Sequence, residues 1–116
     1  MLAQKSIINK GATMRLGSFP CALEKDSLGY KLYKQDVVNE RHRHRYEFNT
    51  IYRDSFSSNG MTLSGQSPDH KLIEMVECSN NDYYIGVQFH PEFKSRPLDP
   101  HPLFLGLIAS VLKKER

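Results

Sequence analysis

The chain has 116 residues, of which 39% are hydrophobic and 25% are charged, as in ordinary soluble globular domains. This length allows one domain at most, and no apolar run approaches the roughly 20 residues of a membrane span. A net charge of +3 is too small to indicate a nucleic-acid partner, and two cysteines make no disulfide framework, so we expect a cytoplasmic protein.

The N-terminal part of the chain is predicted to form a tail, a strand and a short helix. Residues 1–12 are polar and unpatterned, so we assign them to a tail or loop and residues 13–116 to a single partial domain. Residues 14–23 favour a strand that Gly17 and Pro20 interrupt, as at a sheet edge or a bulge.

Two short helices are predicted in the first half. Asp26 and Ser27 can cap a helix that runs to about residue 34, with Leu28 and Leu32 on one face. The second begins after residue 49, an asparagine that can act as its cap, and ends at Asn59-Gly60. Its aromatic residues at positions 52 and 56 are four apart and are expected to pack together.

The second half is predicted to be an antiparallel meander followed by a helix. Alternating or apolar segments at 61–66, 72–78 and 83–89 are separated by short polar turns, which is typical of successive antiparallel strands. After a proline-rich connection, the last helix carries an apolar stripe that we expect to face the core: Phe104, Leu107, Ile108, Val111 and Leu112.

The clearest chemical motif lies where the last strand ends, in Gly-Val-Gln-Phe-His-Pro-Glu-Phe (residues 86–93). Pro91 biases the preceding residue toward an extended backbone, in which side chains two apart share a face. His90 and Glu92 are therefore expected to be neighbours, and a carboxylate beside an imidazole fixes its tautomer. Such a pair can be the base and orienting group of a nucleophilic triad, or simply a surface ion pair.

A run of alternating arginine and histidine at residues 41–45 has several interpretations. It can be a solvated basic loop, or it can contact phosphate or RNA, although interleaved aromatic residues are absent. A metal site is not predicted, because His42 and His44 alone do not complete a zinc shell.

The motif around His90 closely resembles the segment with the catalytic His and Glu of class I glutamine amidotransferases. The run Glu-Arg-His-Arg-His-Arg-Tyr-Glu-Phe-Asn (residues 40–49) resembles one found in CTP synthases. Residues 11–21 and 89–108 also resemble that family, in the same order, so the likeness covers nearly the whole chain. It implies an α/β fold: the C-terminal half of a class I glutamine amidotransferase, or flavodoxin-like, domain.

Transferred by position, the resemblance assigns catalytic roles to His90 and Glu92 and places Arg45 at the substrate L-glutamine. An arginine fork suits the α-carboxylate of an amino acid. Arg41 and Arg43 receive no such role and are expected to be structural or interface residues.

The sequence lacks a nucleophile of the expected type. The family places its cysteine in a glycine-rich turn between a strand and a helix. Cys21 follows Pro20, and Cys78 lies between Glu77 and Ser79, so both are expected to be packing residues.

The resemblance implies an enzyme larger than this chain. A synthetase domain with ATP and Mg²⁺ would be supplied by the missing N-terminal part, no cofactor would bind this chain, and the whole enzyme would be a homotetramer that aminates UTP to CTP. The alternatives are a part of another glutamine-dependent class I amidotransferase, or a phosphate- or RNA-binding module. We expect the isolated chain to be inactive.

Overall fold

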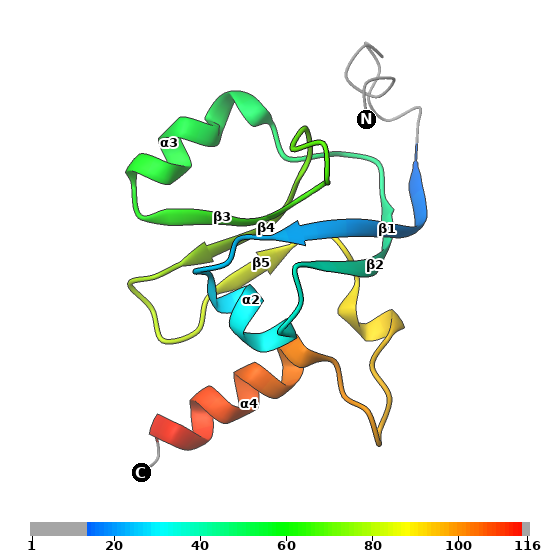
Figure 1. Cartoon of the computed structure of the whole chain (residues 1–116), viewed down its shortest axis with the longest axis vertical. Helices are drawn as coiled ribbons and strands as arrows, with labels where there is room; N and C mark the ends of the chain where they lie inside the picture. Colours follow the sequence, from blue (N-terminus) through cyan, green and yellow to red (C-terminus); the bar gives the residue numbers. More distant parts are fainter. Residues whose placement is uncertain (1–13, 115–116) are drawn as a thin grey trace.

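The computed structural model describes residues 14–114, and their centre is a five-stranded sheet in the order β2-β1-β3-β4-β5 (Figure 1). All neighbouring strands in it are antiparallel. The elements in chain order are β1 (Arg15–Leu23), α2 (Leu28–Tyr33), β2 (Val37–His44), η2 (Thr50–Tyr52), α3 (Arg53–Ser58), β3 (Met61–Gln66), β4 (Ile73–Cys78), β5 (Ile85–Val87), η3 (Pro91–Phe93) and α4 (Pro102–Lys114). The predicted tail at residues 1–12 lies outside the described residues.

The predicted meander is confirmed in strands β3, β4 and β5. Met61 pairs with Cys78 between β3 and β4, and Met75 pairs with Val87 between β4 and β5. Strand β5 is shorter than the predicted 83–89 segment, although the amide of Gln88 still donates to the carbonyl of Glu74 at 2.9 Å. The meander therefore ends just before His90.

Strand β1 is not the edge strand that its Gly17 and Pro20 suggest. It pairs with β2 from Arg15 to Ala22, and with β3 only through Ala22 and Leu23. Pro20 is tolerated because one side of β1 has no β3 partner over most of its length, so that side needs no ladder donor. Gly17 has a φ of +116°, a conformation that favours glycine.

Strand β2 was not predicted, although its sequence alternates in the way a strand does. Its buried side chains are Val38, Glu40 and His42, and the residues between them are exposed. The alternation was hard to recognise because two of these three inward residues are polar. Residues 41–44 thus lie in the edge strand of a sheet, and the solvated-loop interpretation is wrong for them.

The helix predicted after Asp26 is α2, and Ser27 is its N-cap: the Ser27 hydroxyl accepts from the Tyr30 amide at 3.1 Å. Its buried residues are Gly29 and Tyr33, whereas Leu28 and Leu32 are half-buried. A β-carbon on Gly29 would lie 2.8 Å from the sulfur of Met75, so a larger residue at this position would require the Met75 side chain to move.

The second predicted helix is divided into η2 and α3, with Asn49 capping η2. The expected pair of aromatic residues at 52 and 56 does not form the main contact. The Phe56 ring packs edge-to-face on Phe48 at 4.9 Å, while Tyr52 remains 53% exposed. The tighter first turn changes the direction in which residue 52 points.

The hydrophobic core lies where the sheet meets α2 and the start of α4, and it contains Cys21, Leu23, Tyr33, Val38, Met75, Phe89 and Leu103. The predicted orientation of α4 is wrong. Leu103 and Gly106 are its buried residues, and the predicted stripe is 40–57% exposed. Figure 1 shows α4 running away from the sheet, so nothing in residues 14–114 covers that apolar face. No helix within that range is long and apolar enough to cross a membrane.

Candidate functional site

His90 and Glu92 meet in the short turn that follows β5. The Nδ1 atom of His90 lies 2.8 Å from Oε2 of Glu92, which confirms their expected proximity. The backbone at His90 is extended, but Pro91 then opens the 3₁₀ helix η3, so the two side chains converge across a turn. The imidazole ring stacks on Phe93 at 4.8 Å, and its side chain is 36% exposed.

The hydrogen bond fixes the chemistry of this pair. A carboxylate only accepts, so Nδ1 of His90 carries the proton and Nε2 carries a lone pair when the ring is neutral. The bond from His90 lowers the pKa of the Glu92 carboxyl, which therefore stays ionised. The arrangement supplies an oriented, solvent-accessible imidazole that can accept a proton at Nε2.

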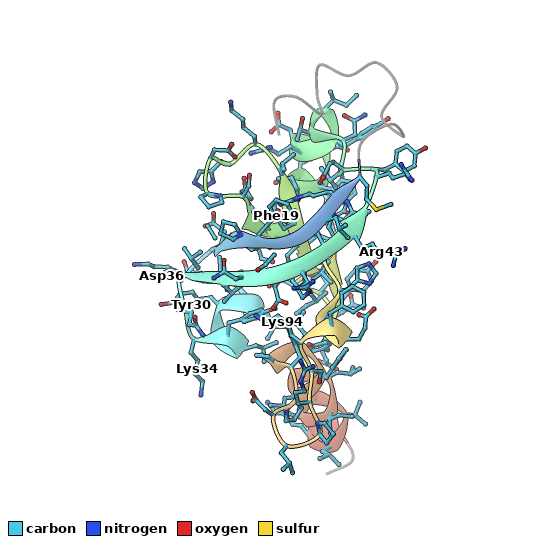
Figure 2. The ribbon with its side chains drawn as sticks, turned by 90° about the vertical axis from the view of Figure 1, so that its right-hand side faces the viewer. Phe19, Tyr30, Lys34, Asp36, Arg43 and Lys94 are labelled. Atoms are coloured by element: carbon cyan, nitrogen blue, oxygen red, sulfur yellow. The ribbon has the colours of Figure 1, made fainter. Side chains whose placement is uncertain are left out.

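Three successive residues of β2 hold the segment that carries this pair. The amide of His90 donates to the carbonyl of Arg41 at 2.8 Å, and the ammonium of Lys94 donates to the carbonyl of Asn39. The imidazole of His101 lies 2.5 Å from the Glu40 carboxylate. Figure 2 shows Lys94 beside β2, close to the turn that follows His90. Strand β2 is thus the scaffold for the turn.

Glu40 is the buried anchor of this scaffold. Its Oε2 accepts from the Tyr33 hydroxyl at 2.5 Å and from Nε2 of His101 at 2.5 Å. Nδ1 of His101 accepts from the Leu103 amide, so the proton is on Nε2 and points at Glu40. Burial, and then the bond to Glu40, raise the pKa of Tyr33, so its hydroxyl stays protonated and donates.

The histidines of the basic run face inward. His42 is 1% exposed and packs edge-to-face against Phe19 and Phe89, with ring centroids 5.5 and 5.8 Å apart. Burial foremost, and then Arg15, lower the pKa of His42 to about 3, so it is neutral. The exposed Arg41 and Arg43 alternate with these histidines along the strand (Figure 2 marks Arg43).

A buried ion pair near these histidines was not predicted from the sequence. The Arg15 guanidinium makes two hydrogen bonds to the Glu74 carboxylate, at 2.8 and 2.5 Å, and lies 4.5 Å from the centre of the Phe19 ring. A third, longer contact of 3.4 Å reaches Glu47. One sequence signal was available: Arg15 is an even number of positions from the buried Cys21 and Leu23, so it lies on the same face of the strand.

Arg45 comes directly after the last residue of β2, and its side chain is exposed. The structure therefore places it at the end of the same strand whose middle holds the His90 turn. Among residues 14–114, no group of three or more His, Cys, Asp or Glu side chains is arranged to hold a metal ion.

Neither cysteine is placed as a partner for His90. Cys21 is buried, and its burial, helped by Glu74 and Glu40, raises its pKa to about 12. Cys78 ends β4, whereas His90 follows Val87, which pairs with Met75 toward the other end of that strand. At about 3.3 Å per residue, the strand register separates Cys78 from the His90 turn.

Comparisons with known proteins show which family the chain belongs to. The glutamine amidotransferase class-I model matches residues 1–110. A CTP synthase of Clostridium kluyveri is 56% identical over 112 residues, which are 97% of this chain and 21% of that relative. A CTP synthase of Aquifex aeolicus is 50% identical over all of this chain and 22% of its own length.

A solved structure gives the same result. The glutaminase domain of Trypanosoma brucei CTPS with bound acivicin matches with a TM-score of 0.86 and 38% identity, over 94% of this chain and 44% of that one. The expected α/β amidotransferase fold and the resemblance to CTP synthases are thereby confirmed. The chain spans about a fifth of the length of the curated relatives. It belongs to the glutamine amidotransferase class-I family.

Proposed function

We propose that this chain is the His- and Glu-bearing part of the glutaminase domain of a CTP synthase. In that enzyme, ammonia released from L-glutamine would aminate UTP to CTP. The observation that carries the proposal is the 2.8 Å bond between His90 and Glu92, with the ring exposed at the end of the meander, in a chain of this family.

His90 is the proposed general base and Glu92 its orienting partner. Nε2 of His90 would take the proton of a cysteine thiol, and the thiolate would attack the side-chain amide carbon of glutamine. The imidazolium would return the proton to the leaving nitrogen, which departs as ammonia and leaves a thioester. Water, activated by the same ring, would then release glutamate and the thiol.

The thiol must come from outside these residues. A pKa of about 12 leaves Cys21 protonated at neutral pH, and Cys78 lies at the far end of β4 from the His90 turn. The rest of the domain would supply the nucleophile, together with donors that stabilise the oxyanion of the tetrahedral intermediate.

Arg45 is the proposed binding residue for the glutamine α-carboxylate. A guanidinium can bind both oxygens of that group, and an exposed position after a fixed strand leaves it accessible to substrate.

The remainder of the enzyme is also part of the proposal. ATP and Mg²⁺ would bind a synthetase domain outside this chain, and the assembled enzyme would be a cytoplasmic homotetramer with no nucleic-acid partner. The names and lengths of the relatives support a larger enzyme, since the chain corresponds to about a fifth of a CTP synthase. The cofactors, the oligomeric state, the location and the absence of a nucleic-acid partner are proposed from the family resemblance alone.

The test replaces the matching segment of the Aquifex aeolicus CTP synthase with these 116 residues, which align over their whole length. In this full-length chimera, His90→Ala is expected to lower glutamine-dependent CTP formation by about 10³-fold or more, because the proton acceptor is lost. Amination by added ammonia should be nearly unchanged, because it bypasses glutamine hydrolysis.

Two outcomes would contradict the proposal. One is equal loss of both activities in the His90→Ala variant. The other is an unmodified chimera that uses ammonia but not glutamine.

A further inference from the structure

A directional chain of hydrogen bonds runs through the two histidines of β2 to the backbone beside Arg45. Nδ1 of His44 lies 2.9 Å from the carbonyl oxygen of Tyr46, and Nε2 of His44 lies 2.9 Å from Nδ1 of His42. The carbonyl only accepts, so Nδ1 of His44 carries a proton. Burial lowers the pKa of His44, so the ring is neutral and its Nε2 accepts from Nδ1–H of His42.

The inner end of this chain is fixed in the protein interior. The His42 side chain is fully buried between Phe19 and Phe89, and its remaining nitrogen, Nε2, lies 4.0 Å from the Glu74 carboxylate without a hydrogen-bond partner. The bidentate bond to Arg15 in turn holds Glu74. His42 therefore has little freedom to change its ring orientation, and it sets that of His44.

The outer end of this chain of hydrogen bonds holds the backbone just after β2, which lies outside the sheet. Strand β2 ends at His44, so its ladder stops immediately before Arg45. The bond from the His44 side chain to the Tyr46 carbonyl spans Arg45 and restricts the backbone on both sides of it. Glu47 is also anchored, through the Arg15 guanidinium at 3.4 Å.

We propose that His44 is a positioning residue for glutamine binding, whose Nδ1–H, oriented by His42, holds the backbone around Arg45 so that the guanidinium meets the α-carboxylate. The inference rests on the proposed function, because it assumes that Arg45 binds glutamine. The alternating pattern of arginine and histidine then has a physical reason. The arginines face outward, and the histidines between them face inward and form the chain of hydrogen bonds.

Two substitutions at His44 in the full-length chimera distinguish the roles of its two ring nitrogens. The amide nitrogen of asparagine is attached at the same position as Nδ1, whereas that of glutamine lies near Nε2. His44→Asn should keep the donor to Tyr46 and hold the glutamine KM within about twofold of the parent. His44→Gln should lose that donor and raise the KM roughly 3- to 10-fold, with kcat at saturating glutamine nearly unchanged.

Arg45→Ala and the double variant His44→Gln/Arg45→Ala complete the experiment. If His44 acts through Arg45, His44→Gln should raise the KM in the parent and add almost nothing when Arg45 is absent. A general structural role would instead give the same added loss in both backgrounds, and would overturn the inference. Equal effects of His44→Asn and His44→Gln would also overturn it.

The same data distinguish failure of the positioning role from failure of the proposed function. If Arg45→Ala raises the KM but His44→Gln does not, Arg45 binds glutamine and the positioning role of His44 is wrong. If Arg45→Ala leaves the KM unchanged, the assumed role of Arg45 is wrong and the inference falls with it.

Discussion

Arg41 and Arg45 are both exposed and belong to the same basic run, but the proposal gives them different tasks. Arg45→Ala in the full-length chimera should raise the glutamine KM, because a charge-assisted contact to substrate is lost. The fall in kcat/KM should correspond to a loss of about 2–4 kcal/mol of transition-state stabilisation. Arg41→Ala is the matched control. Its contribution to the His90 turn is a backbone carbonyl, which the substitution leaves in place. Similar mild effects of the two variants would argue against a glutamine site at Arg45.

The two cysteines should differ sharply in reactivity toward iodoacetamide. With a pKa of about 12 instead of 9.0, Cys21 has about 10³-fold less thiolate at pH 8, and its side chain is buried. Half-buried Cys78 should therefore be alkylated first in the folded chimera, and Cys21 only after denaturation. Peptide mass spectrometry measures both rates. Alkylation of Cys21 as fast as Cys78 in the native state would show that its thiol is accessible, and would reopen it as a nucleophile.

At the scale of elements, β2 links the proposed base and the proposed substrate-binding arginine. The carbonyl of Arg41 holds the His90 backbone, Glu40 holds His101, and the end of the strand leads to Arg45. The proposed catalytic and binding groups are thus attached to one strand, which lets the sheet fix their relative positions.

The contact of β3 with its neighbours depends on a glycine. A β-carbon at Gly65 would lie 2.8 Å from the Cys21 sulfur and 2.8 Å from the Met75 β-carbon, which is close to backbone and cannot swing away. Gly65→Ala should therefore lower the free energy of unfolding by about 1–3 kcal/mol. Denaturant titration of the full-length chimera, followed by glutamine-dependent activity, measures this loss.

Gly86→Ala is the control for that substitution. Its added carbon would meet only the Val76 Cγ2 atom, at 3.3 Å, on a side chain that can adjust. We expect a distinctly smaller effect on stability. An equal loss at both positions would mean that the close approach of β1, β3 and β4 at Gly65 is not limiting.

At the scale of the whole molecule, the exposed apolar face of α4 predicts self-association of the isolated chain. Ile108 and Leu112 lie one turn apart on this face and are 57% and 55% exposed. Ile108→Lys/Leu112→Lys should raise the monomer fraction in sedimentation velocity, because charges oppose burial of this face. Leu98→Lys is the control: Leu98 is 99% exposed but lies in the loop before α4, so the change should have little effect.

In the full-length chimera, the same two substitutions should be harmful. There we expect the α4 face to pack against the rest of the domain, so Ile108→Lys/Leu112→Lys should reduce glutamine-dependent activity. The isolated chain should release no ammonia from glutamine, because it has no suitably placed thiol. A monomeric isolated chain that hydrolyses glutamine would contradict both expectations.

The sequence by itself determined the features that depend on local spacing. The cap at Ser27 and the proximity of His90 to Glu92 each involve residues two or three positions apart, whose geometry follows from the backbone. The meander of β3 to β5 joins strands that follow one another in the sequence through short turns. The string around His90 also indicated the family, because it combines residue types in an unusual order.

Only the tertiary structure decided the features that depend on distant residues. Arg15 meets Glu74 across 59 positions, and Glu40 meets His101 across 61, so no local pattern announces either contact. Because the partners of the inward polar residues of β2 are distant in sequence, this segment looked like a solvated loop. A charge can be buried without a large cost only when another group pairs with it. The direction of α4 was mistaken for a related reason: its stripe records an apolar surface, but periodicity does not say which part of a larger domain covers it.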